Sequence, residues 1–447
     1  MTGQPFADIP LTPDDPLGLE RQWLGAGPDS FLGILNGYLG VFVVAFVVTL
    51  LATPLMRRLA LANGIIDHPS DPRKVHTEPV AYLGGAAVFL GLMGGILFSY
   101  LALAWTGLIE FHSATHLIDG LYHAPVPISV ILGLFVIMLV GLLDDVVGIE
   151  PRIKIGGQLF AAAALAIDNV GVNVARGVLA PIGRTLIGNS DLAWTIPVPV
   201  VGETITFDLI YWTGTAIIGL FVLGACNASN LIDGLDGLLS GVTSVCAAGL
   251  LVVAVIMAMA DDGPRDAQRI VLAMALMGAC LGFLPHNFNP ASIFLGDCGS
   301  LLLGFCTIVV ILTLGDTGKT HLVTAGLIIY AIPLIDTTLA MIRRKMAGRR
   351  ISDPDDQHLH HMLKRAMGVK RAVLTLYAIG AGFAVLGVAA SFGRARVVYT
   401  IALVFISFIA VTAIKLARRF QPAPARKPAE PWEAAAGARE PEPAARV

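Results

Sequence analysis

The chain has 447 residues, of which 55% are hydrophobic and 14% are charged, and its mean hydropathy is +0.76. A soluble domain carries about 25% charged residues, so this composition excludes an ordinary soluble protein and indicates a polytopic membrane protein. The formal net charge of −2 decides little, because the placement of charges matters more here than their sum. No nucleic acid is expected among the partners.

The two ends of the chain differ in composition from the rest. Residues 1–30 are rich in Asp, Pro and Gly and lack a basic region followed by an apolar core, so they are not a signal peptide. We expect them to form an external N-terminal segment. Residues 31–420 follow as one transmembrane domain. Residues 421–447 are mostly Ala, Pro, Glu and Arg, which cannot bury a core, and are expected to be a disordered cytoplasmic tail.

Apolar segments within residues 31–420 are long enough, with their flanks, to span a membrane as helices. The expected fold is therefore all-α, a polytopic integral membrane protein of about 10–11 transmembrane helices. Two β-branched runs around Val201-Gly202-Glu203 predict a short hairpin on the external side. The apolar segments are 31–55, 80–105, 127–143, 155–174, 209–225, 238–260, 270–284, 301–314, 322–342, 372–390 and 397–416.

Lysines and arginines fall mostly in alternate loops between these segments. The positive-inside rule places those loops in the cytoplasm. The opposite loops have no Lys or Arg from residue 107 to residue 126 and only scattered ones elsewhere. With an odd number of helices, the N-terminus is then external and the C-terminus cytoplasmic. The basic loops carry Arg57, Arg58, Arg73 and Lys74, then Arg152 and Lys154, then the run 343–371, and then Lys415, Arg418 and Arg419.

Residues 226–237 place two amides, two carboxylates and two glycines between two apolar segments. Asn230 and Asp233 are three residues apart, as are Asp233 and Asp236, so these side chains are neighbours on a helical turn. Such a cluster of oxygen ligands suits a hard cation such as Mg²⁺. Helix capping is the alternative explanation, but a cap needs one such residue rather than three.

Four further polar clusters lie on the predicted cytoplasmic side. Separately, each has an ordinary explanation: loop charge, a helix end, a turn, or, for the histidines, a zinc site, although no Cys is near and no spacing matches a zincin. Together they offer acids for Mg²⁺, cations for phosphates and glycines for close backbone approach, as phosphoryl transfer requires. The clusters are Arg73-Lys74-Val75-His76; Gly141-Leu142-Leu143-Asp144-Asp145 with Arg152 and Lys154; Phe294-Leu295-Gly296-Asp297-Cys298-Gly299-Ser300; and Asp355-Asp356-Gln357-His358-Leu359-His360-His361 with Arg349 and Arg350.

Three motifs resemble the signatures of the polyprenyl-phosphate N-acetylhexosamine-1-phosphate transferases, in matching order over roughly residues 35–420. His358-Leu359-His360-His361 resembles the branch that uses UDP-N-acetylglucosamine or related UDP-sugars. The peptidoglycan-precursor branch instead tends to have three consecutive histidines followed by Phe-Glu. The sequence departs from the resembled branch at Asp356, where an Arg is common. The three motifs are Asn230-Leu231-Ile232-Asp233-Gly234-Leu235-Asp236-Gly237, Gly296-Asp297-Cys298-Gly299-Ser300 and Leu142-Leu143-Asp144-Asp145.

The resemblance implies that residues 31–420 are a transferase domain that moves a sugar-1-phosphate from a UDP-sugar to undecaprenyl phosphate and releases UMP. It implies a Mg²⁺ cofactor, with Mn²⁺ as a substitute, held by Asn230 and Asp297. Asp144 and Asp145 would orient or deprotonate the acceptor phosphate or assist the metal, and Asp233 would sit beside the metal. These three aspartates are the predicted catalytic residues.

Substrate-binding roles also follow from the resemblance. Lys74 and Lys154 would contact phosphates, His76 would lie beside Lys74, and Asp236 would lie towards the uridine. With the orientation of the basic loops, this predicts a multi-pass protein of the inner, cytoplasmic membrane that has its active site on the cytoplasmic face and makes cell-envelope polysaccharide precursors. The oligomeric state stays open, and a homodimer is one candidate. The residues expected on the phosphates of the nucleotide sugar are Arg349, His358, His360 and His361.

Two other functions stay open at this point. One is a phospho-N-acetylmuramoyl-pentapeptide transferase, and the other, from a different class, is a cation-coupled membrane transporter. Transporter sites lie near the bilayer midplane on broken helices, whereas Asp144, Asp233 and Asp297 are expected at helix ends on one side. One in-line displacement and a route through an aspartyl intermediate are equally compatible with the sequence.

Overall fold

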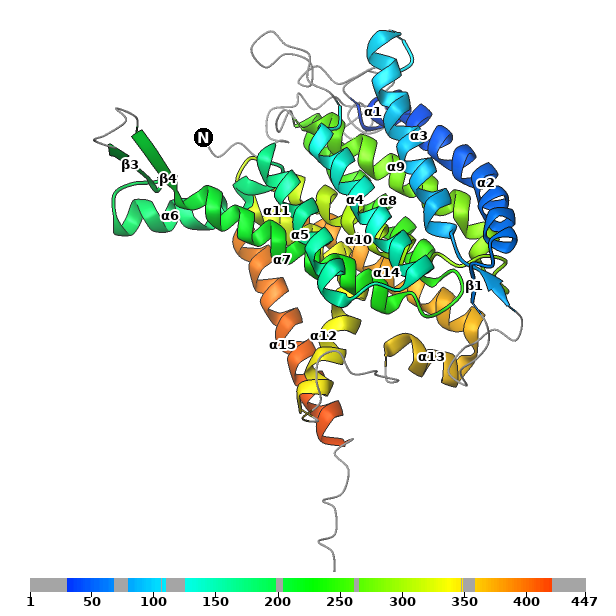
Figure 1. The fold of residues 1–447 in the computed structure, drawn as a ribbon. Coiled ribbons are helices and arrows are strands. Elements are labelled where there is room, and N and C mark those ends of the chain that lie inside the picture. Colours follow the sequence, from blue (N-terminus) through cyan, green and yellow to red (C-terminus); the bar gives the residue numbers. More distant parts are fainter. Residues whose placement is uncertain are drawn as a thin grey trace, which may run out of the picture.

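The structure is a computed structural model of the whole chain, and its helices stand side by side in one bundle (Figure 1). Eight of the described helices are long and apolar enough to cross a membrane. The described residues are 30–67, 79–105, 107–109, 125–197, 204–260, 265–346, 348 and 358–419. The eight helices are α2 (Leu39–Ala62), α3 (Gly84–Ala104), α4 (Ile128–Val147), α7 (Leu209–Ile232), α8 (Leu238–Met259), α9 (Asp266–Asn287), α10 (Gly296–Thr313) and α14 (Val369–Ser391).

The remaining helices are shorter, bent or peripheral. Two of them, α11 and α12, form a pair bent by 80° that brings the number of spans to nine if the pair counts as one. With α5 and α15, every predicted apolar segment lies on a helix, and the all-α polytopic fold is confirmed. These helices are α1 (Phe31–Gly37), α5 (Pro151–Ile167), the 3₁₀ turn η3 (Val172–Val174), α6 (Arg176–Leu186), α11 (Thr320–Ile329), α12 (Ala331–Met346), α13 (Leu359–Met367) and α15 (Ala395–Arg419).

Two small antiparallel sheets complete the fold. The predicted hairpin is present: β3 (Ala193–Pro197) pairs with β4 (Thr204–Asp208), with Thr195 opposite Thr206. It projects from the bundle beside α6 (Figure 1). The second sheet, β1 (Ile66–Asp67) with β2 (Val80–Ala81), was not expected from the sequence. It ties the start of α3 to the segment before α10, because Phe294 donates its backbone N–H to the carbonyl of Ala81 at 2.9 Å.

Helix α10 is the centre of the bundle, and all of its residues from Cys298 to Thr313 are buried. It packs against α3, α4, α7, α8 and α9. Two neighbouring helices approach its first turn very closely. A Cβ on Gly85 would lie 2.1 Å from the backbone nitrogen of Gly299, and one on Gly141 would lie 2.5 Å from the Cα of Cys298. Glycine at both positions lets α3 and α4 bring their backbones against the start of α10.

The bend between α11 and α12 occurs at Tyr330. The Tyr330 hydroxyl lies 2.5 Å from Ser229 Oγ and donates to the carbonyl of Ala225 at 3.1 Å, so the break is tied to α7. The thiol of Cys246 donates to the carbonyl of Ile329 at 3.3 Å, which helps to satisfy a carbonyl that the break frees. The bend turns α12 towards α13, and both lie at the end of the bundle opposite α1 (Figure 1).

Candidate active site

The first turn of α10 carries the centre of the polar site. Lys154, in the first turn of α5, lies between two carboxylates: its Nζ is 2.7 Å from Asp144 Oδ2, and it also pairs with Asp297. Asp297 receives a second bond at 2.7 Å, on Oδ1, from the amide of Asn230, which also donates to Ser300 Oγ at 3.0 Å. Four helix ends, those of α4, α5, α7 and α10, therefore meet through charged and amide side chains.

The adjacent acids Asp144 and Asp145 do different things. Asp144 faces Lys154, and its Oδ1 accepts the backbone N–H of Ile149 at 3.1 Å. Asp145 accepts the backbone N–H of Asp297 at 2.7 Å and that of Cys298 at 2.9 Å. These donors belong to the first turn of α10, where N–H groups lack helical partners and a negative charge is favoured. Asp145 is therefore the cap of α10, and its predicted catalytic role stays a prediction.

Asp233 ends α7 and has an unusual charge environment. Burial, together with the neighbouring carboxylates of Asp297, Asp145 and Asp236, raises the pKa of Asp233 to about 8. Among the described residues, Lys154 is the cation whose ion pairs to these acids are resolved, so the acids outnumber it. A group of carboxylates with this excess of negative charge is stabilised by a proton or by a cation.

Asp236 holds a loop in place. Its Oδ2 accepts from the amide of Asn289 at 2.8 Å and from the backbone N–H of Ala291 at 3.0 Å. Asn287 fixes the same turn, because its Oδ1 accepts the backbone N–H of Gly237 at 3.1 Å. Sequence reasoning missed Asn287 and Asn289. Their only signal is two amides beside Pro290 after an apolar helix, and it does not indicate the partner.

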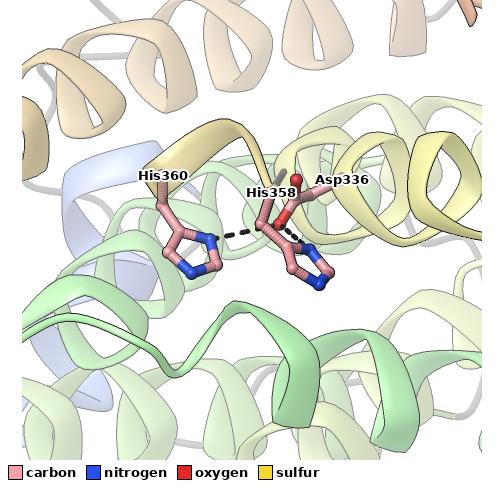
Figure 2. Close-up of side chains that lie close together, drawn as sticks. All are labelled: Asp336, His358 and His360. Atoms are coloured by element: carbon pink, nitrogen blue, oxygen red, sulfur yellow. Dashed lines mark hydrogen bonds and ion pairs between the residues drawn. The ribbon is translucent and has the colours of Figure 1, made fainter. Parts of the chain in front are cut away.

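The histidine motif forms a second cluster around a carboxylate that the sequence did not single out (Figure 2). Asp336 Oδ2 lies 3.0 Å from His358 Nδ1 and 3.2 Å from His360 Nδ1. All three residues are buried, and their ligand atoms lie close enough together to hold a metal ion. Asp336 lies within the apolar segment 322–342, where an ionisable residue is itself a signal of function.

Gly234 joins the two clusters. A Cβ on Gly234 would lie 2.5 Å from His360 Nε2, so the imidazole reaches the loop that directly follows Asp233. His361 is a near neighbour, with its ring centroid 4.3 Å from that of His360. Burial and the nearby His360, His358, Lys364 and Arg365 lower the pKa of His361 to about 4, so its ring is neutral at pH 7.

Tyr82, just after β2, is a further residue that the sequence did not indicate. Its ring packs edge-on against Phe294, with centroids 6.0 Å apart. Burial, and then the charges of Asp67, Asp145, Asp233 and Asp297, raise the pKa of Tyr82 well above its ordinary value. The phenol therefore belongs to the electrostatic environment of the carboxylates and stays protonated.

The predicted site residues divide into those that meet and those that the structure does not describe. Asp297 lies together with its three partners Lys154, Asn230 and Asp145, and Asp144 joins them through Lys154. Asp233 and Asp236 lie on the neighbouring loop. Of the histidines, His360 lies against Gly234, with His358 and His361 beside it. Lys74, His76 and Arg349 lie outside the described residues.

The fold and this site define a multi-pass membrane protein with a carboxylate-rich polar centre where its helices end. A family model described as "Glycosyl transferase family 4" matches residues 127–315, which include the carboxylates but not the histidines. The chain is 31% identical, over 85% of its length and 93% of the relative's, to a Bacillus subtilis (strain 168) protein named "Probable undecaprenyl-phosphate N-acetylglucosaminyl 1-phosphate transferase".

Two other relatives have related names. The decaprenyl-phosphate N-acetylglucosaminephosphotransferase of Mycolicibacterium smegmatis is 32% identical over 90% of this chain and 94% of its own length. The phospho-N-acetylmuramoyl-pentapeptide-transferase of Desulforudis audaxviator is 30% identical over 77% of this chain and 96% of its own length. The chain belongs to the family of polyprenyl-phosphate N-acetylhexosamine-1-phosphate transferases, as the motifs indicated.

Proposed function

We propose that this protein transfers N-acetylglucosamine-1-phosphate from UDP-N-acetylglucosamine to undecaprenyl phosphate and releases UMP. The product, a lipid-diphosphate-linked sugar, would serve cell-envelope polysaccharide synthesis. The observation that carries the proposal is Lys154 held between Asp144 and Asp297, beside Asn230. The names of the Bacillus and Mycolicibacterium relatives support the sugar and the class of lipid.

The reaction exchanges one phosphorus–oxygen bond for another. An oxygen of the lipid phosphate bonds to the β-phosphorus of the UDP-sugar, the bond from that phosphorus to the bridging oxygen breaks, and UMP leaves with the electron pair. A phosphomonoester has its second pKa near about 6, so the acceptor is largely dianionic at neutral pH and needs no strong base. Asp144, fixed by Lys154 and by the N–H of Ile149, then has an orienting role, and Lys154 offsets the charge of the reacting phosphates.

The oxygen ligands of this site fit Mg²⁺. In the described residues two carboxylates, Asp144 and Asp297, share the ammonium of Lys154, and hard cations prefer oxygen ligands. Asp297 and Asn230 would hold the ion, since the Asn230 amide group donates to Asp297 and its amide oxygen is the atom suited to a cation. When bound, Mg²⁺ would neutralise charge on the diphosphate of the donor. Mn²⁺ has similar ligand preferences and is expected to substitute.

The membrane gives the two substrates different routes. The lipid phosphate arrives from the bilayer and the nucleotide from the aqueous side, so they can meet only where the helices end. We place that end on the cytoplasmic face of the inner membrane, because the basic loops lie on the same side. A homodimer stays a prediction.

The decisive experiment is transfer by purified protein in detergent. Radiolabel from UDP-N-acetylglucosamine should enter the lipid extract only with undecaprenyl phosphate and Mg²⁺, with one UMP released per transfer. Asp297→Asn should lose most of this turnover while inserting and melting normally. No incorporation from UDP-N-acetylglucosamine by well-folded protein would refute the proposed donor.

Two alternatives are tested in parallel. The name of the Desulforudis relative supports the alternative that the sugar donor is UDP-N-acetylmuramoyl-pentapeptide. Supplying that UDP-linked substrate in the same assay tests this alternative. Cation-coupled transport would appear as an ion-dependent flux in proteoliposomes. It is disfavoured because Asp297 lies in the first turn of α10 and Asp144 in the last turn of α4, at helix ends rather than at mid-span.

A further inference from the structure

Asp336 is a buried carboxylate with three hydrogen bonds from one short segment of the chain. Its Oδ1 accepts the backbone N–H of Leu359 at 2.7 Å, and its Oδ2 faces Nδ1 of both His358 and His360. Leu359 is the first residue of α13, whose N-cap, His358, provides no side-chain cap of its own. The carboxylate of α12 therefore caps α13 from outside and fixes the histidine motif to the bent helix pair.

The bonding pattern determines where the imidazole protons are. An ionised carboxylate only accepts hydrogen bonds, so each Nδ1 that faces Oδ2 must carry its proton. The opposite nitrogen, Nε2, is then directed away from Asp336. For His360 that direction is known, because Nε2 points at Gly234 in the loop after Asp233. Figure 2 shows both rings turned to the carboxylate by the same nitrogen.

We infer that Asp336 is a positioning residue, which holds His358 and His360 as Nδ1–H tautomers so that the unprotonated Nε2 of His360 faces the loop after Asp233, where it can accept a hydrogen bond from the UDP-sugar. This rests on the proposed function for the identity of the donor. The arrangement resembles the general case in which a buried carboxylate sets the tautomer and orientation of a functional imidazole. His361 has no bond to Asp336 among those described and is the natural comparison within the motif.

Asp336→Asn tests the inference because it separates the two roles of the carboxylate, which are to cap α13 and to orient the imidazoles. Its side-chain oxygen can still accept from Leu359, so α13 keeps its cap. Its NH₂ group then faces both imidazoles, where it can only donate, and this requires Nδ1 to become an acceptor. The prediction is a switch of His358 and His360 to the Nε2–H tautomer.

The first readout does not depend on activity. The protein is labelled with ¹⁵N-histidine, and the ring nitrogen shifts of wild type and Asp336→Asn are compared. His360→Asn assigns one of the signals. Wild type should show two Nδ1–H rings that change to Nε2–H in Asp336→Asn. Wild-type rings without Nδ1–H, or rings that do not change in the variant, would overturn the inference.

The second readout is steady-state kinetics with each substrate. Asp336→Asn should lower kcat/KM for the UDP-sugar by about tenfold, the scale of one lost hydrogen bond, because Nε2 then carries the proton and can no longer accept from a hydroxyl or N–H group of the UDP-sugar, while KM for undecaprenyl phosphate changes less than twofold. His360→Asn should share this defect with normal stability, because its amide N–H replaces Nδ1–H and only Nε2 is lost. Equal losses on both substrates would indicate a structural role and overturn the inference.

Asp316→Asn is the matched control. Asp316 is also a buried acid with a cationic partner, Arg265, at 2.5 Å, but it follows the far end of α10. The Asp316→Asn variant should be less stable to heat than wild type, with unchanged histidine tautomers and unchanged kinetics for the UDP-sugar.

Zinc content provides a further check: stoichiometric zinc in wild type, with loss of activity on chelation and recovery with zinc, would overturn the positioning role. Wild type without transfer from any UDP-sugar would refute the proposed function, while unchanged tautomers in an active enzyme would refute only this inference.

Discussion

The carboxylate of Asp145 accepts the backbone N–H of Asp297 at 2.7 Å, so the last turn of α4 caps the first turn of α10. The preceding residue, Asp144, points instead to Lys154. A pair of adjacent acids is therefore divided between a structural task and a chemical one. A Cβ on Gly296 would lie 2.4 Å from Asp145 Oδ2, so glycine is what admits the cap.

This division predicts that one isosteric substitution lowers stability and that the other lowers activity. Asp145→Asn should lower the free energy of unfolding by about 1–3 kcal/mol, because one of the two N–H groups at the start of α10 loses its acceptor. Asp144→Asn should leave stability nearly unchanged and lower kcat at least tenfold, because the acceptor loses an orienting group. Thermal melts and single-substrate kinetics on both variants measure the split. A stable, inactive Asp145→Asn protein would show that the cap is not its main role.

Asp233 predicts a pH dependence of stability in the metal-free protein. Its pKa is raised from 3.8 to about 8 by burial and by the nearby acids. Between those values the folded protein keeps a proton that the unfolded chain has lost, so stability falls as pH rises through this window. In EDTA, the midpoint of thermal unfolding of wild type should therefore fall from pH 4 to pH 8 relative to Asp233→Asn, which cannot ionise.

A divalent cation provides the control for that measurement. Mg²⁺ competes with the proton for the same negative charge, so it should raise the unfolding midpoint more at pH 8 than at pH 5. A wild-type curve parallel to that of Asp233→Asn across the whole range would contradict the raised pKa.

The membrane orientation predicted from the loops is tested by reporter fusions. A reporter fused after Arg349 or after Arg419 should be cytoplasmic, and one inserted within residues 107–124 should be external, because the basic loops stay on the inner side. Alkaline phosphatase is active only on the external side, and green fluorescent protein fluoresces only on the cytoplasmic side. An external Arg419 fusion would reverse the model of the active-site face.

The sequence predicted the elements whose signals are local. Hydropathy located every apolar helix, and the β-branched runs located the β3–β4 hairpin. The resemblance, rather than spacing, paired Asn230 with Asp297, and the structure joins these two side chains at 2.7 Å. The break at Tyr330 has no local signal, because it depends on bonds to α7 and α8.

The part of the site that sequence reasoning missed depends on long-range contacts. Asp336 lies 22 residues before His358, and Tyr82 approaches the acids only because β2 lies beside the segment before α10. Tertiary packing determines such partners, and an apolar or aromatic stretch does not reveal them. The charge of Asp336 within an apolar segment was the one usable signal.

The last prediction concerns Gly234, where the two clusters touch. In Gly234→Ala the added Cβ would lie 2.5 Å from His360 Nε2, a distance that real Cβ contacts do not reach, so the imidazole must move. We expect kcat/KM for the UDP-sugar to fall about tenfold while KM for undecaprenyl phosphate is maintained, because His360 is displaced and the carboxylates are not. Gly224→Ala is the matched control: it lies in α7, a Cβ there meets nothing within 4 Å, and alanine favours a helix more than glycine does. Gly224→Ala should be as active as wild type and at least as stable. If Gly234→Ala matches it in donor kinetics, His360 does not act at this loop.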